Sequence, residues 1–325
     1  MLRFLSRPAV RLVDRYLPDP FIFVLLLTVV AAAAAIGVER QTPLAVMRMW
    51  GDGFWNLLTF SMQMLLILVT GFMLASSPPV KKLLQRLAAL ANGPGGAILL
   101  VTYVSLVASW INWGFGLVVG ALFAKELARL VRVDYRLLVA SAYSGFVVWH
   151  GGLAGSIPLT IATEGHFTAE QIGVIGTGST IFAFFNLAIV VCLFVAIPLV
   201  NRAMLPDEKE SVYVDPKLLD DAPAARVRVT RPAERLENSV TLAWLVGIPG
   251  VIFLLDHFVF RGGGLNLNIV NFMFLSLAIV LHRTPRSLLE SLNEAIKGGA
   301  GIVIQFPFYA GIMAIMVQSG LAESM

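Results

Sequence analysis

Residues 98–130 read ILLVTYVSLVASWINWGFGLVVGALFAKELARL, two apolar arms around a centre that carries an asparagine and two glycines. Each arm, 98–111 and 117–130, has 14 residues, or roughly 21 Å of helix at about 1.5 Å per residue. A bilayer core is about 30 Å thick, so neither arm is expected to cross it alone. The centre at 112–116 is expected to break the helix. We therefore predict a re-entrant hairpin with its tip at 112–116.

The rest of the chain contains further apolar blocks of the length that spans a membrane. Of its 325 residues, 58% are hydrophobic and 14% are charged, and the mean hydropathy is +0.81. Soluble domains carry about 25% charged residues, so this composition is typical of a membrane protein instead. The predicted spans are 21–38, 54–76, 137–162 with an interruption, 172–200, 240–260, 265–281 and 298–319. We predict an all-α, polytopic membrane protein with a re-entrant hairpin and broken helices, embedded in a lipid bilayer.

Basic residues predict the orientation, because they concentrate in the cytoplasmic loops of membrane proteins. With the N-terminus inside and 98–130 entering and leaving on one side, 21 of the 24 lysines and arginines fall inside. Only Arg40, Arg48 and Arg261 fall outside. If 98–130 crossed as one kinked helix, more basic residues would lie outside. The pattern favours the hairpin and a cytoplasmic N-terminus in a bacterial inner membrane. It also accounts for the net charge of +4 without a nucleic-acid partner.

The segments outside the spans suggest how the chain is divided. Residues 1–20 are predicted to form an amphipathic cytoplasmic helix, and a cleaved secretory signal is the alternative for this end. Two amphipathic stretches, 79–91 and 285–296, are expected along the cytoplasmic interface. The predicted parts are a first transmembrane half at 21–200, including the broken span 137–162, a cytoplasmic connector at 201–239 and the start of a second half at 240–325. A small regulatory domain is the alternative for the connector.

The first candidate site is the hairpin tip, SWINWGFG at 109–116. Non-helical backbone at membrane depth is tolerated where it is buried in protein or lines a cavity. The helix that restarts after the tip presents free N–H groups, which suit a carboxylate. Ser109 and Asn112 add side-chain hydrogen-bonding groups, and Gly114 and Gly116 allow close backbone approach. We predict substrate binding here. The alternative is that the glycines serve helix packing and the two tryptophans anchor the interface.

The second candidate site is WHGGLAGSIPLT at 149–160. Gly151, Gly152 and Gly155 interrupt the span near its middle, and Ser156 followed by a proline is an N-cap signature. A broken span offers carbonyl groups to a cation and amide groups to an anion. We therefore add Gly151, Gly152, Gly155 and Ser156 to the substrate site. A kink that serves packing alone is the alternative.

The residues suggest two routes for a coupling ion. No Asp or Glu lies mid-span, so either Na⁺ is bound by carbonyls with Ser109, Asn112 and Ser156, or a proton is carried on His150. Oxygen ligands suit Na⁺, and we favour it. A His in a span is a functional candidate, although a neutral His bonded to a neighbouring helix is the alternative reading. Neither a cofactor nor a structural metal is expected.

Motifs for catalysis are missing from this sequence. It contains no H-E-x-x-H, G-x-S-x-G, Walker-type G-x-x-x-x-G-K or Cys/His cluster, and its one cysteine is Cys192. We therefore predict no catalytic residues and no enzyme activity. The spans 54–76 and 298–319 show a weak internal symmetry, which suggests an inverted repeat of the kind that secondary transporters use. Homodimer formation is left open.

Several motifs resemble the short-chain fatty acid transporter family. They are LPDP at 17–20, MWGDGFWNLL at 49–58, INWGFGLVVGA at 111–121, DPKLL at 215–219 and QFPFYAGI at 305–312. The resemblance implies cation-coupled secondary uptake of short carboxylates such as acetoacetate or butyrate. It also implies a longer protein whose second half completes the site, and it assigns His150 no role, because the family pattern has glycines there. The rival functions are a channel-like or regulatory protein that binds a carboxylate without coupled transport, and an intramembrane enzyme.

Overall fold

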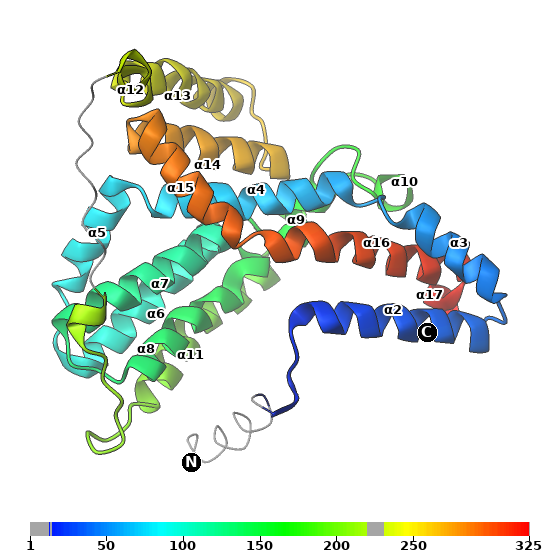
Figure 1. The fold of residues 1–325 in the computed structure, drawn as a ribbon, viewed down its shortest axis with the longest axis horizontal. Helices are drawn as coiled ribbons and strands as arrows, with labels where there is room; N and C mark the ends of the chain where they lie inside the picture. The colour runs from blue at the N-terminus through cyan, green and yellow to red at the C-terminus, as the bar shows by residue number, and fades with distance from the viewer. Residues whose placement is uncertain (1–12, 14, 220–230, 325) are drawn as a thin grey trace. The chain divides into compact units, whose positions relative to one another are not determined.

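The computed structural model describes residues 13, 15–219 and 231–324. In this part of the chain every regular element is a helix, and none is a strand. The longer helices in Figure 1 are α2 (Pro20–Gly37), α3 (Pro43–Gly53), α4 (Leu58–Ala75), α5 (Pro78–Ala88), α6 (Gly93–Ile111), α7 (Trp113–Leu130), α8 (Tyr135–Ser144), α11 (Phe184–Ala203), α13 (Val240–Leu255), α14 (Leu267–His282), α15 (Pro285–Lys297) and α16 (Ala300–Ser319). The short ones are η1 (Gly145–Gly151), α9 (Ser156–Ile161), α10 (Ala169–Ile172), η2 (Thr177–Ser179), η3 (Pro216–Leu219), α12 (Pro232–Glu237), η4 (Asp256–Phe260) and α17 (Leu321–Ser324).

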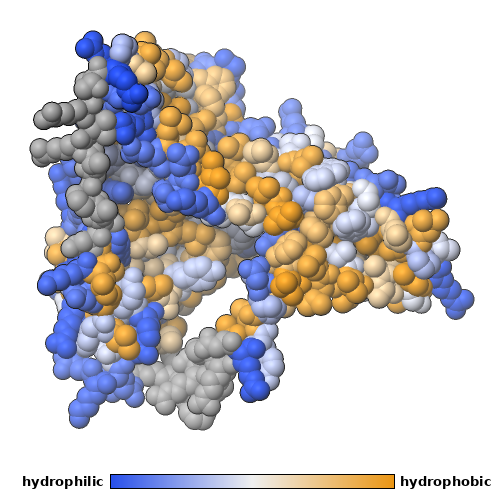
Figure 2. Space-filling model, viewed as in Figure 1, coloured by the Kyte–Doolittle hydropathy of each residue, from blue (hydrophilic) through white to orange (hydrophobic). Residues whose placement is uncertain are grey.

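Seven helical segments in the described residues are long and apolar enough to cross a membrane. Large hydrophobic side chains lie exposed along them, for example Leu26, Val29 and Val30 on α2 and Leu245 on α13. Figure 2 shows hydrophobic residues (orange) over much of the visible face of the part that holds α2, α3 and α16. Exposed apolar side chains at this density need lipid around them. The prediction of an all-α, polytopic membrane protein is confirmed.

The helices group into two compact units. The first comprises residues 1–65 and 298–325, in which α2 and α3 pack against α16. Its interior contains Ala31, Ala35, Val46 and Ile315. The second unit comprises residues 66–297 and contains the hairpin, the broken span and the connector. All the predicted site residues therefore belong to the second unit.

The hairpin consists of α6 and α7, which run side by side (Figure 1). Its arms are longer than predicted, with 19 residues in α6 and 18 in α7, or roughly 27–29 Å each. The 14-residue arms were wrong because Gly93–Ala97 and Trp113–Gly116 are helical as well. The length argument for re-entry therefore fails for α6, which is itself a candidate span. The distribution of lysines and arginines still favours a hairpin with both ends on the cytoplasmic side, because it does not depend on arm length.

Two other sequence predictions need correction. The span expected at 172–200 begins only at Phe184, because the glycine-rich segment after α10 is not a continuous helix, and Gly173 there has φ +70°. The span expected at 265–281 is α14, whose 16 residues make it shorter than the seven candidates. The amphipathic stretches do form helices, α5 and α15. The helix predicted at 1–20 lies largely outside the described residues.

The first half of the connector is folded against the base of the hairpin. Asp134, which is 4% exposed, accepts hydrogen bonds from the amides of Leu137 and Val212 at 2.8 and 2.7 Å. The Tyr135 amide donates to the Val212 carbonyl oxygen at 2.8 Å. Leu219 is buried in the same core as the hairpin helices. This part of the connector is thus an integral part of the second unit.

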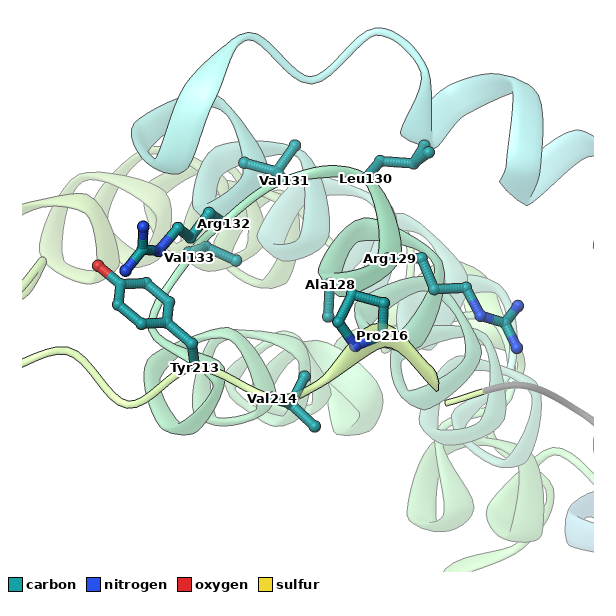
Figure 3. Close-up of a pocket in the computed structure, with 9 residues that line it drawn as sticks. All are labelled: Ala128, Arg129, Leu130, Val131, Arg132, Val133, Tyr213, Val214 and Pro216. Carbon is teal, nitrogen blue, oxygen red and sulfur yellow. The ribbon is translucent and has the colours of Figure 1, made fainter. Parts of the chain in front are cut away.

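Figure 3 shows the cavity that this contact forms, about 380 Å³ in volume. The Arg132 guanidinium lies over the Tyr213 ring, 4.4 Å from its centroid. Arg129 donates to the Leu219 carbonyl oxygen and pairs with Glu126 at 2.6 Å. The arginines of this cavity therefore hold the connector in place.

Candidate functional site

Asn112 alone separates the two arms of the hairpin. Its backbone is extended, with φ −158° and ψ 129°, so it ends α6 and begins α7. Its Oδ1 accepts a hydrogen bond from the Phe115 amide at 2.9 Å, which caps α7. The predicted break at 112–116 is therefore one residue long. The Phe115 and Gly116 amides are already bonded to Asn112, so fewer N–H groups are free for a ligand than the sequence suggested.

Four buried polar atoms at the tip have no hydrogen-bond partner among the residues that the structure describes. They are Ser109 Oγ, Trp110 Nε1, Asn112 Nδ2 and Trp113 Nε1. Ser109 and Asn112 are 1% and 0% exposed. Each unsatisfied buried group costs about 1–3 kcal/mol, so a cluster of four within one motif points to a ligand. All four can donate, and an indole N–H can only donate. The complementary ligand is therefore an acceptor, as a carboxylate is.

The glycines of the tip allow close packing. A Cβ on Gly116 would lie 2.2 Å from Ser109 Oγ, and one on Gly114 would lie 2.7 Å from the Ile67 carbonyl oxygen. Gly71 on α4 has the reciprocal contact, since a Cβ there would lie 2.4 Å from the Phe115 amide nitrogen. Gly114 and Gly116 thus set the fit of the tip against α4 and α6.

The broken span lies directly beside the tip. It runs as α8, then the 3₁₀ turn η1, then a break at 152–155 and α9. The Leu153 amide donates to the Trp110 carbonyl oxygen at 2.7 Å, and the Trp113 and Trp149 rings meet at 5.3 Å between centroids. A Cβ on Gly152 would lie 2.3 Å from the Trp110 carbonyl oxygen. The structure therefore brings the two sequence motifs together.

The other residues of the second motif have different surroundings. Ser156 is buried, but the N-cap of α9 is Gly155 and Ser156 is its first residue, so the predicted N-cap was wrong by one position. A Cβ on Gly155 would meet the His150 carbonyl oxygen at 2.5 Å, which explains a glycine there. The Gly151 carbonyl oxygen accepts from Asn186 Nδ2 at 3.0 Å. Sequence reasoning missed Asn186, although a lone asparagine in an apolar span is a visible signal.

His150 is exposed, and its ring meets the Trp149 ring edge-on, with 4.2 Å between the centroids. It is not among the buried polar groups of the tip. The buried histidine of this unit is His282, which is 5% exposed and bonded at both ring nitrogens. No sequence pattern indicates this burial, because His282 stands at the end of its span.

A row of polar side chains runs along one face of α6 towards the tip. Thr102, Ser105 and Ser109 recur at helical spacing, followed by Asn112. Asn201 on α11 donates to Thr102 Oγ1 at 3.0 Å and to Ser144 Oγ at 2.7 Å. Ser105 bonds the Ala142 carbonyl oxygen. Among the described residues, no group of three or more His, Cys, Asp or Glu could hold a metal ion.

Known proteins resemble this chain along its whole length. The family model described as short chain fatty acid transporter matches residues 1–325. A protein of Escherichia coli (strain K12) named "Putative short-chain fatty acid transporter" is 46% identical over 325 residues, which cover 99% of this chain and 74% of the relative. A protein of the same name in Haemophilus influenzae is 42% identical over 332 residues, with the same coverage. No solved structure matches.

Proposed function

This chain belongs to the short-chain fatty acid transporter family, and we propose that it takes up short monocarboxylates, such as butyrate or acetoacetate, together with a cation. The observation that carries the proposal is the set of buried, unpartnered donors at the hairpin tip. A carboxylate has only acceptor oxygens, and it would satisfy donors that otherwise cost stability.

We assign the carboxylate to Ser109, Asn112 and Trp113. The Asn112 Nδ2 and Trp113 Nε1 groups would donate to it, next to the N-terminal end of α7, whose partial positive charge favours an anion. The short alkyl chain would pack on the rings of Trp149 and Phe146, which meet at 4.7 Å between centroids. This leaves the glycine-rich break at 152–155 as the opposite wall.

For the arrangement in the membrane, we propose a cytoplasmic N-terminus and a hairpin that enters and leaves from the cytoplasmic side of a bacterial inner membrane. The support is the distribution of lysines and arginines, 21 of 24 of which then lie inside. The non-helical residue at the tip is buried in protein, as such backbone must be at membrane depth.

We also propose that alternating access rests on an inverted repeat. Two amphipathic helices, α3 and α15, begin with Thr-Pro, and each threonine hydroxyl accepts from the amide three residues on, at 3.2 Å for Thr42 and 3.3 Å for Thr284. Each leads into an apolar helix, α4 or α16, that carries a glutamine at the same distance from the threonine, Gln63 and Gln305. In the proposed topology these two repeats, α3 with α4 and α15 with α16, have opposite orientations in the membrane.

Counterflow in proteoliposomes tests the proposal. Vesicles loaded with unlabelled butyrate and diluted into labelled butyrate should accumulate label transiently, because a carrier exchanges substrate across the membrane. A channel-like protein gives only equilibration, and that result would contradict the assignment. Asn112→Ala should abolish the overshoot, whereas Asn92→Ala, at the exposed other end of α6 and without a capping hydrogen bond, should keep it.

A further inference from the structure

His282 joins three helices of the second unit. It is the last residue of α14, and it is buried. Its Nε2 lies 2.6 Å from the Met73 carbonyl oxygen on α4, and its Nδ1 lies 2.9 Å from Ser287 Oγ on α15. Figure 1 shows α14 and α15 beside α4. A second bond, from Ser76 directly after α4 to Ser291 on α15, lies nearby, with 2.5 Å between the two hydroxyl oxygens.

These partners can bond both protonation states of the imidazole. A carbonyl oxygen only accepts, so Nε2 carries a hydrogen and donates to Met73. In the neutral ring, Nδ1 accepts from the Ser287 hydroxyl. When a proton binds Nδ1, that nitrogen becomes a donor, and the hydroxyl can rotate to accept. The histidine can therefore gain or lose a proton without leaving either partner.

The surroundings of His282 act on its protonation in opposite directions. The Met73 carbonyl belongs to the last turn of α4, whose C-terminal end favours a cation. Burial disfavours the protonated ring, and to a smaller extent Lys81 on α5 repels it. On α15, Arg286 pairs with Glu290 at 3.1 Å and Lys297 with Glu294 at 2.6 Å. The remaining basic groups on adjacent segments are Lys82 and Arg86 on α5 and Arg283 after α14.

His282 is linked to the hairpin tip through α4 and α14. Gly71 stands two residues before Met73, a rise of about 3 Å, and a Cβ on it would lie 2.9 Å from Asn112 Oδ1. On α14, Phe274 meets Phe115 of the tip with ring centroids 6.0 Å apart. A change of charge at His282 thus acts on the two helices that touch the tip.

We propose that His282 is the protonation site that couples proton uptake to carboxylate binding at the tip. This rests on the proposed transport function and names its coupling cation as a proton, in place of the Na⁺ that the sequence favoured. His282 acts as a positioning residue, because it reaches the tip through α4 and α14. The step adds one proton to Nδ1, and the same proton leaves when the carboxylate leaves. One proton with one monocarboxylate moves no net charge.

His282→Gln tests the proposal, because a glutamine amide can still donate to Met73 but cannot take up a proton. Two rates are measured with labelled butyrate: uptake driven by an inward proton gradient, and counterflow. The ratio of the first rate to the second should be at least tenfold lower in His282→Gln than in the wild type. The matched control, His166→Gln in the loop before α10, should keep the wild-type ratio. A wild-type ratio in His282→Gln would overturn the proposal, as would wild-type uptake that follows a Na⁺ gradient and ignores the proton gradient. Absence of counterflow in the wild type would instead contradict the transport function itself.

Ser287→Ala provides a second measurement should His282→Gln not fold. It removes only the partner of Nδ1 and keeps the bond to Met73. Charge-assisted hydrogen bonds are the stronger ones, so the protonated ring loses more than the neutral ring does. The midpoint of the pH profile of butyrate uptake should therefore move to lower pH. An unchanged midpoint in folded Ser287→Ala would overturn the proposal.

Discussion

The amide of Leu153 donates a hydrogen bond to the carbonyl oxygen of Trp110 at 2.7 Å. This bond joins the break in the broken span, at 152–155, to the last turn of α6, just before Asn112. It brings two motifs that lie far apart in the sequence into one candidate site.

Gly152→Ala should weaken the contact between the break and the tip. A Cβ at this position would lie 2.3 Å from the Trp110 carbonyl oxygen and 2.9 Å from the Trp110 Cα, and backbone atoms cannot move aside easily. Overpacking of this kind costs about 1–3 kcal/mol, so thermal unfolding in detergent should occur at a lower temperature. Gly178→Ala is the control, because nothing lies within 4 Å of a Cβ there. Equal unfolding temperatures for the two variants would contradict the close approach.

Asn112→Asp should remove the Nδ2 donor while keeping an oxygen that can cap α7. The carboxylate keeps an oxygen that can accept from the Phe115 amide and cap α7, but it has no Nδ2 donor and repels an anionic substrate. Butyrate transport per folded molecule should fall at least tenfold, equivalent to about 1.4 kcal/mol, and the unfolding temperature should fall as well, because the new carboxylate is fully buried. Asn112→Ala should lose both transport and about 1 kcal/mol of stability, because the cap goes too. Normal transport by folded Asn112→Asp would exclude Nδ2 as a substrate ligand.

Cysteine labelling tests the re-entrant hairpin. In a Cys192→Ser background, single cysteines at Gln85, on α5 before the hairpin, and at Arg132, just after it, should react with an impermeant thiol reagent from the cytoplasmic face only. The expectation follows from the distribution of lysines and arginines along the sequence. The length of the arms does not predict whether the hairpin is re-entrant. Labelling from opposite faces would show that the segment between residues 85 and 132 crosses the membrane an odd number of times, which would contradict a hairpin with both ends cytoplasmic.

Acid should release the connector from the base of the hairpin only at low pH. Burial acts to raise the pKa of Asp134, but hydrogen bonds from Val212, Leu137 and Arg136 outweigh it, so the pKa lies below its usual value. A carboxyl group whose pKa is lowered in the folded state stabilises the fold at pH values above its unfolded-state pKa of about 3.9. This stabilisation is lost as the pH falls through the folded-state pKa. Hydrogen exchange at the Val212 amide should therefore stay slow down to about pH 4.

Asp134→Asn should release the connector at neutral pH. One side-chain oxygen becomes an NH₂ group, so either the cap on Leu137 or the bond from Val212 is lost, at a cost of about 1–3 kcal/mol. Exchange at Val212 should accelerate accordingly. Asp207→Asn, on the exposed part of the connector, is the control. Slow exchange at Val212 in Asp134→Asn would show that other contacts hold the connector.

The amino-acid sequence by itself determined the class of fold, most of the spans, the amphipathic helices α5 and α15, and the positions of the tip and the break. These features depend on neighbouring residues, because hydropathy over one helix length and the turn preferences of glycine and asparagine are local properties. Arm length was misjudged since Gly93–Ala97 can continue a helix when other helices pack around it.

Only the tertiary structure decided which polar groups are buried together. His150 lies in the conspicuous motif and is exposed, whereas His282 bonds a carbonyl oxygen 209 residues away. The sequence predicted only a cytoplasmic connector between two halves, yet its Val212 amide bonds Asp134, 78 residues earlier. The partners that satisfy or bury a polar group come from distant segments, and their identity is fixed by how the helices pack, which local sequence patterns do not encode.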